Sequence, residues 1–91
     1  MTGIEFDSVV FSEKGTCIAY CPELDISSCG KDVDQARQNL KTAVRLFIEE
    51  AQKIGTLEQI LEEAGYVIDD TGEYRAPRLL ATETMSIALE K

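Results

Sequence analysis

Carboxylates are the side chains in this sequence that could most readily do chemistry. Glu5 and Asp7 are two residues apart and share one face if residues 4–12 form the strand that their alternation indicates. Asp69 and Asp70 could offer oxygen ligands to a divalent cation. A two-metal hydrolase needs several carboxylates that converge on ions about 4 Å apart. No sequence pattern brings the two pairs of carboxylates together. We therefore interpret Glu5 and Asp7 as the solvent-exposed face of a strand, and Asp69 and Asp70 as part of a turn.

Other catalytic side chains are scarce. The chain has no histidine, which removes imidazole acid–base catalysis, Cys–His nucleophiles and most zinc sites. It also has no Gly-x-Ser-x-Gly motif and no phosphate-binding glycine loop. The three cysteines, an odd count, fit a reducing compartment, and we interpret Cys17, Cys21 and Cys29 as small buried apolar residues. The sequence therefore predicts a protein that is not an enzyme and uses no cofactor or metal.

Basic residues recur every four positions along one flank of a predicted helix, at Arg37, Lys41 and Arg45. They could grip an acidic segment or a phosphate backbone. Acidic residues bracket them at helical spacing, so a solvated, salt-bridged face is the simpler interpretation. Leu46 falls on the back of the same helix, where it could contact a second helix or a partner. A possible interface therefore comprises Arg37, Lys41, Arg45 and Leu46.

Length and charge limit the remaining functions. Ninety-one residues fit one domain, residues 1–91. A domain of this size has a small core, so we expect it to self-associate as a dimer or higher oligomer. The formal net charge of -8 repels phosphate backbones and attracts basic partners. Direct DNA binding is further disfavoured because the second helix carries Glu58, Glu62 and Glu63, where a recognition helix is basic. With no apolar run near about 18 residues and no signal peptide, we expect a soluble, cytoplasmic protein without a membrane segment.

Hydrophobic periodicity predicts an α+β fold in the order β-β-β-α-α-β. The expected elements are strands at 4–12, 16–21 and 26–29, a long helix from 33 to about 53, a short helix at 57–64, and a last strand at 83–90 that returns to the sheet. Short loops favour an antiparallel sheet, with the long helix packed on one face. The second strand is apolar on both faces, which predicts a central position.

The two predicted helices have recognisable ends. Asp32 and Gln35 have the form of a capping box, and Gly55 follows the long helix. Thr56 and Gln59 have the same form at the start of the short helix, and Gly65 follows its end. The long helix has one apolar arc, which consists of Val33, Ala36, Leu40, Ala43, Val44, Phe47, Ile48 and Ala51.

One combination of residues resembles a known family. A strand ends in the run Ala19-Tyr20-Cys21-Pro22-Glu23-Leu24, a short strand and Gly30 follow, and Asp32 opens a helix that contains Ala36, Asn39-Leu40 and Ala43. This order and spacing resemble the HicB-like antitoxins of HicAB toxin–antitoxin pairs over residues 4 to about 50. The matched residues that we single out are Ala19, Tyr20, Pro22, Glu23, Leu24, Gly30, Asn39 and Leu40.

The resemblance implies a partly degraded ribonuclease-H-like sheet with one helix packed on it. It also implies a partner, a small basic HicA-type toxin that cleaves mRNA and that the antitoxin masks. The matched motif implies no catalytic residue; Pro22, Glu23, Leu24 and Gly30 are expected to shape the corner and the strand-to-helix turn. Full-length antitoxins often carry a C-terminal DNA-binding domain, and we recognise none here. The alternative function is a stand-alone, homo-oligomeric HicB-like protein with no toxin partner.

Overall fold

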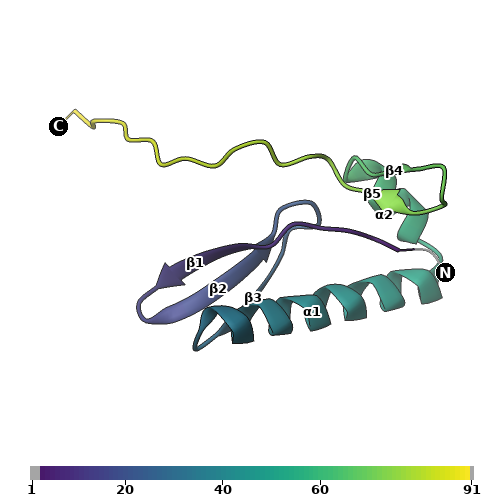
Figure 1. Cartoon of the computed structure of the whole chain (residues 1–91), viewed down its shortest axis with the longest axis horizontal. Coiled ribbons are helices and arrows are strands. Elements are labelled where there is room, and N and C mark those ends of the chain that lie inside the picture. The colour runs from purple at the N-terminus through teal and green to yellow at the C-terminus, as the bar shows by residue number, and fades with distance from the viewer. Residues whose placement is uncertain (1–2, 91) are drawn as a thin grey trace.

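The computed structural model describes residues 3–90 and confirms the predicted α+β class and element order (Figure 1). In chain order the elements are β1 (Val9–Glu13), β2 (Thr16–Cys21), β3 (Ile26–Gly30), α1 (Val33–Ile54), α2 (Leu57–Glu63), β4 (Val67–Ile68) and β5 (Tyr74–Arg75). The first three strands form one antiparallel sheet in the order β1-β2-β3, and β4 and β5 form a separate two-stranded hairpin. The second strand is central, as predicted from its two apolar faces.

A tight turn fixes the register of the first two strands. Lys14 and Gly15 have φ values of 50° and 82°, which is the backbone of a two-residue hairpin turn that matches strand twist. The pairing that follows sets Val10 opposite Ala19 and Phe11 opposite Ile18. Alternate residues therefore face opposite sides of the sheet, and Phe11 and Ile18 lie on the side away from the core.

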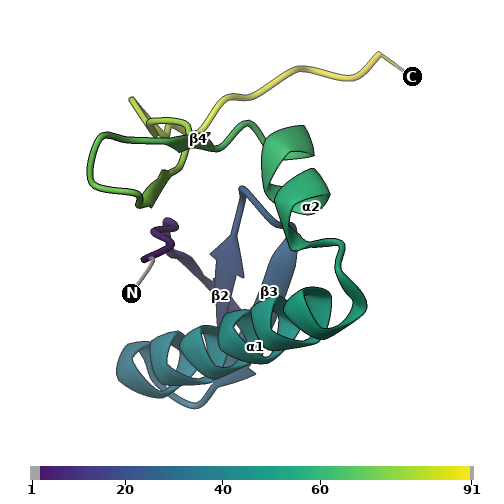
Figure 2. The ribbon, with the colours of Figure 1, turned by 90° about the vertical axis from the view of Figure 1, so that its right-hand side faces the viewer.

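The core lies between the sheet and α1, which covers one face of the sheet (Figures 1 and 2). Its fully or almost fully buried members are Ala19, Cys21, Ala36, Leu40 and Val44. Small side chains on β2, Ala19 and Cys21, let the helix approach closely. The helix-covered face is buried, whereas the opposite face of the sheet has no covering element among residues 3–90.

The ends of α1 follow its sequence signals. The Asp32 carboxylate accepts a hydrogen bond from the Gln35 N–H at 2.7 Å, and the Gln35 side chain accepts one from the Lys31 N–H at 2.8 Å. Gly55 ends the helix with φ 78°, in the left-handed region that favours glycine. The predicted apolar arc is buried in its middle, but Val33 and Phe47 at its margins are exposed.

The start of α2 differs from the prediction. The Thr56 hydroxyl makes no hydrogen bond to a described residue, and the Gln59 side chain instead donates to Glu63 at 3.2 Å, so the predicted capping box is wrong. The helix is held by burial of Leu61 rather than by its cap. Gly65 does end the helix, because its N–H bonds to the Glu62 carbonyl at 3.0 Å.

The first strand is shorter than predicted. Residues 4–8 leave the sheet, and only an isolated parallel bridge joins Ile4 to Tyr74. The cause is competition for backbone groups: the Asp7 N–H bonds to the Glu23 carboxylate and the Glu5 N–H bonds to the Tyr74 carbonyl. The N-terminal segment is therefore drawn towards the C-terminal hairpin.

The predicted last strand at 83–90 is wrong in position. These residues form no strand and are exposed, and the extended C-terminal element is instead the β4–β5 hairpin. Alternation of Met85, Ile87 and Leu89 satisfies the strand period, but a strand also needs an edge to pair with. Although β1 has a free edge, residues 83–90 pair with no described strand.

The cysteines were predicted to be buried, and only Cys21 is. Cys17 is half-buried, and Cys29 is exposed because it pairs opposite Ile18 and shares the uncovered face of the sheet. Among residues 3–90, no helix combines the length and the apolarity needed to cross a membrane.

Candidate functional site

The corner between β2 and β3 is held by its own side chains. The Tyr20 hydroxyl donates to the Asp25 carboxylate at 2.9 Å, and this hydrogen bond raises the pKa of Tyr20. Asp25 has φ 56°, a left-handed conformation that Asp tolerates in turns. Leu24 packs against the core, whereas Pro22 is exposed at the corner.

Glu23 fastens this corner to the N-terminal segment. Its two carboxylate oxygens lie 3.2 and 3.1 Å from the Asp7 backbone nitrogen, which donates to them, and the Cys21 thiol lies 3.5 Å from one of them. Burial raises the pKa of Glu23, and it raises the pKa of Cys21 to about 11. A thiol with a raised pKa is a weak nucleophile at neutral pH, so this cluster is suited to holding the backbone rather than to covalent chemistry.

The remaining motif residues join α1 to the sheet. The Asn39 side-chain amide donates to the Cys29 carbonyl of β3 at 2.8 Å. A Cβ atom on Gly30 would lie 2.5 Å from the Ala36 backbone nitrogen, so only glycine fits where β3 turns into α1. Ala19 and Leu40 are fully buried in the core. The motif residues therefore lie at the two ends of β3, with the corner at one end and Gly30 at the other, and in the core between β2 and α1.

The basic flank of α1 is a solvent-exposed surface. Arg37, Lys41 and Arg45 are all exposed, and only Arg37 has an ion pair to a described residue, Asp34 at 3.8 Å. Leu46 is 57% exposed. An exposed pair of this kind contributes little to stability. The structure leaves these four side chains accessible to solvent.

Two of the four carboxylates considered for metal binding, Glu5 and Asp69, are engaged by an arginine instead. Arg75 contacts Glu5 at 2.9 Å, Asp69 at 2.6 Å and Glu73 at 3.6 Å. Over residues 3–90, no group of three or more His, Cys, Asp or Glu side chains is arranged to hold a metal ion. These contacts bridge the N-terminal segment to the hairpin.

Asp69 organises the β4–β5 turn, and its protonation is expected to loosen the hairpin. Its carboxylate accepts hydrogen bonds from the Thr71 hydroxyl at 2.6 Å, from the Arg75 guanidinium at 2.6 Å, and from two backbone N–H groups. These bonds hold the pKa of Asp69 well below its usual range, first through Thr71 and then through Arg75. Its stabilising contribution is present above the usual Asp pKa of about 3.9 and is lost as the pH falls towards the lower folded-state pKa.

An NMR titration of the hairpin amides, with hydrogen exchange at Thr71 and Glu73, measures this effect. We expect Asp69→Asn to weaken amide protection at neutral pH and to remove the acid transition. The control is Asp70→Asn, because the Asp70 side chain makes none of these hydrogen bonds. A transition of Asp69 at the usual carboxylate pKa would contradict this account of the turn.

A hollow between α2 and the β4–β5 hairpin is the feature that the sequence patterns did not reveal. Its volume is about 230 Å³, and its lining residues, which we call the α2–β4 groove, are Glu58, Glu62, Tyr66, Ile68 and Tyr74. Figure 1 shows α2 and the hairpin side by side over the C-terminal end of α1. A larger hollow of about 650 Å³ adjoins it and shares Glu58 and Tyr74.

The groove combines negative charge with exposed apolar surface. Glu58 and Glu62 are exposed on one side of α2, and Ile68 is 60% exposed opposite them. Tyr66 forms the base: it is buried, its hydroxyl donates to the Glu5 carbonyl at 2.7 Å, and burial raises its pKa. The sequence signal that could have found this site is an acidic helix followed directly by Tyr66, Val67 and Ile68.

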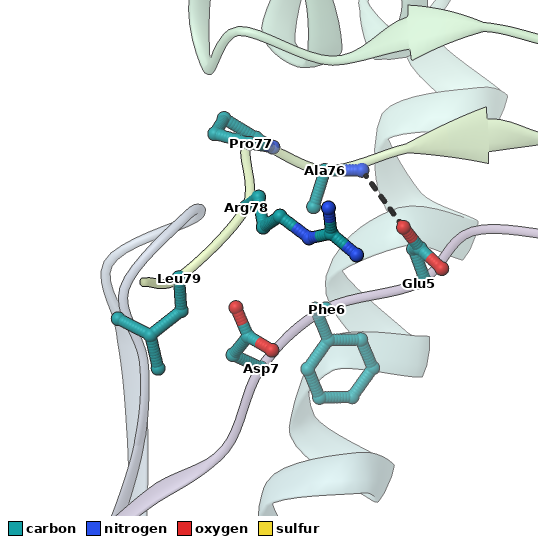
Figure 3. Close-up of a pocket in the computed structure, with 7 residues that line it drawn as sticks. All are labelled: Glu5, Phe6, Asp7, Ala76, Pro77, Arg78 and Leu79. Atoms are coloured by element: carbon teal, nitrogen blue, oxygen red, sulfur yellow. Dashed lines mark hydrogen bonds between the residues drawn. The ribbon is translucent and has the colours of Figure 1, made fainter. Parts of the chain in front are cut away.

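A second cleft lies where the N-terminal segment and the C-terminal residues diverge. Figure 3 shows Glu5, Phe6 and Asp7 facing Ala76 to Leu79 across it, with Arg78 and Asp7 directed into the space between. Its volume is about 450 Å³, and the Ala76 N–H donates to Glu5 at its edge at 3.3 Å. The positive and negative side chains in this cleft offset one another, unlike those of the α2–β4 groove.

Comparisons with known proteins give no relative: no family model, no curated protein and no solved structure matches the chain. The fold and the groove therefore define only a class, a small acidic α+β protein with an acidic, partly apolar groove.

Proposed function

We propose that this chain is a HicB-like, antitoxin-type inhibitor that binds and masks a small basic HicA-type toxin, an mRNA-cleaving ribonuclease. The α2–β4 groove is the proposed contact surface. The chain acts as a binding module and contributes no catalytic residue of its own. The motif from Ala19 to Leu40 supports the family assignment, because it is the stretch that carries the resemblance.

The observation that carries the proposal is the pairing of Glu58 and Glu62 with an apolar wall in one groove. A lysine or arginine can lay its aliphatic stem on Ile68 and Tyr74 while its charged group approaches the two carboxylates. The net charge of -8 adds a long-range attraction that speeds encounter with a basic protein. Both features favour a cationic partner over nucleic acid.

The basic flank of α1 is a poorer surface for the same partner. Arg37, Lys41 and Arg45 present positive charge, which repels a basic protein and raises the free energy of docking there. The side of the domain that carries α2 is acidic. We therefore assign the partner to α2 and the hairpin, and expect the flank of α1 to remain outside the interface.

Charge reversal in the groove tests the proposal. The test begins with the genes that flank this one: a small basic open reading frame there supplies the partner, which is co-expressed and then titrated calorimetrically as a purified protein. The absence of such a reading frame would overturn the paired function. The double variant Glu58→Lys and Glu62→Lys is expected to raise the dissociation constant by about 10- to 100-fold and to end protection of cells from the toxin. Raised salt should weaken the wild-type complex as well.

The matched control is Glu49→Lys with Glu50→Lys, which makes the same charge change at two exposed positions on α1. The control should keep most of the affinity, because its charges lie outside the groove. Equal losses in the two double variants would show that only overall charge matters and would overturn the assigned surface. Absence of any complex with the neighbouring basic protein would overturn the proposed function.

A further inference from the structure

The β4–β5 hairpin, residues 67–76, has little within itself to keep it in place. None of its residues is buried, and both residues of β4 are exposed. A two-stranded hairpin without a hydrophobic core of its own is at best marginally stable in water. The hairpin nevertheless supplies Ile68 and Tyr74 to the α2–β4 groove. The shape of the groove therefore depends on the contacts that keep the hairpin docked.

Residues 3–7, which we call the N-terminal strap, supply these contacts. In the part of the chain that the structure describes, every hydrogen bond and ion pair that leaves the hairpin ends on Gly3 or Glu5. The Tyr74 N–H donates to the Gly3 carbonyl at 2.9 Å, and the Glu5 N–H donates to the Tyr74 carbonyl at 3.4 Å. The Glu5 carboxylate accepts a hydrogen bond from the Arg75 guanidinium at 2.9 Å. The hairpin is therefore held by a segment about 70 residues away in the sequence.

The same strap supports the base of the groove and is anchored at the core. Its Glu5 carbonyl accepts the hydrogen bond of the Tyr66 hydroxyl at 2.7 Å. Phe6 packs against the core cluster, and the Asp7 N–H donates to the two Glu23 carboxylate oxygens at 3.2 and 3.1 Å. Figure 2 shows the start of the chain between the hairpin and α1. Glu23 does not line the groove, yet it holds the segment that positions the groove's walls.

We propose that the N-terminal strap controls the α2–β4 groove: the groove keeps its shape while Glu23 and Glu5 hold the strap, and it opens when the strap detaches. Detachment frees the hairpin and the Tyr66 hydroxyl together, whereas the fully buried core residues lie on α1 and β2 and stay packed. Binding surfaces are commonly drawn from such locally opening regions. Glu5 and Glu23 are then positioning residues for the groove.

The control by the strap is a property of the free chain, and its consequence for a basic partner rests on the proposed function. A partner that requires the closed groove binds only the fraction of molecules in which the strap is docked. A substitution at Glu23 would therefore weaken binding without removing any group that lines the groove.

Amide hydrogen exchange on the free chain, measured by NMR, tests the control by the strap. Glu23→Ala removes the acceptor of the Asp7 N–H and alters no hydrogen bond of the hairpin. We expect exchange at the Asp69 and Tyr74 amides to become at least about 10-fold faster, with no change at Leu40 in the core. Glu23→Gln keeps a side-chain acceptor and should preserve most of the protection. A role of Glu23 confined to its own corner would leave the two hairpin amides unchanged.

Glu5→Ala is the second variant, because it removes the carboxylate that holds Arg75 and should accelerate the same amides. The matched control is Asp7→Ala, which removes the same charge from the strap and keeps its backbone N–H. The Asp7 carboxylate accepts no hydrogen bond from a described residue, so this variant should exchange like the wild type.

Wild-type exchange rates at the hairpin in both Glu23→Ala and Glu5→Ala would overturn the proposal. Equal acceleration at the hairpin and along α1 would overturn it too, because the groove would then open only when the whole domain unfolds. Fast exchange in Glu23→Gln would contradict the role of Glu23 as the acceptor that holds the strap. These measurements need no partner, so the control by the strap can fail while the proposed function stands, and the reverse.

Discussion

Replacing Leu40 with alanine is expected to lower the free energy of unfolding by about 3–4 kcal/mol. Leu40 is fully buried in the cluster that joins α1 to β2, between Ala19, Cys21 and Val44. Its neighbours on β2 are already small, so they cannot expand to fill the cavity that the substitution leaves. Urea denaturation followed by circular dichroism measures the loss.

The size of the domain makes this loss severe. A 91-residue chain is expected to be stable by about 5–10 kcal/mol, so the variant loses a third or more of that stability. Leu46→Ala is the control on the same helix, because Leu46 is 57% exposed and its truncation should cost less than about 0.5 kcal/mol. Equal losses at the two positions would contradict the placement of the core.

The substitution Gly30→Ala is expected to cost about 3 kcal/mol, a large effect for one methyl group. The added Cβ would lie 2.5 Å from the Ala36 nitrogen and 2.8 Å from the Gln35 carbonyl carbon. Both are backbone atoms in the first turn of α1, so the helix must move away from the sheet or the strand must bend. Thermal unfolding should report a lower melting temperature.

Gly3→Ala is the matched control for this glycine. There the added Cβ would meet only the Glu73 carboxylate, at 3.2 Å, and a flexible side chain can move away at little cost. The variant should therefore unfold within about 0.5 kcal/mol of the wild type. If Gly30→Ala were as well tolerated as Gly3→Ala, the close packing of α1 against β3 would be wrong.

Local signals in the sequence were sufficient for much of the fold. The two apolar faces of β2 predicted its central place, and Ala19 and Cys21 are buried there. Asp32 and Gly55 marked the ends of α1, because capping depends on neighbouring residues alone. Each of these predictions rests on contacts between residues close in the chain or on the regular spacing of apolar residues along one strand or helix.

The predictions that failed depend on contacts between distant residues. Residues 4–8 alternate like a strand, but Glu23 and Tyr74 take their backbone N–H groups away from the sheet. Residues 83–90 have the strand period but pair with no described strand. A period of two residues specifies an extended segment without specifying its partner.

The candidate site was hidden for the same reason. From the sequence, Glu58 and Glu62 indicate only an acidic helix. The groove forms because the chain reverses at Gly65 and places Ile68 and Tyr74 beside these two residues. By contrast, Arg37, Lys41 and Arg45 were visible from sequence, because they repeat along a single helix. Their exposure is as expected for a solvated flank, and none of the three lines the α2–β4 groove.

The most direct test of the proposed function is an NMR titration of the labelled chain with the product of a small basic open reading frame found next to its gene. We expect amide shifts and line broadening at saturation to cluster at Glu58, Glu62, Ile68 and Tyr74, with small changes along the basic flank of α1. Perturbations centred on Arg37, Lys41 and Arg45, with the α2–β4 groove unaffected, would contradict it.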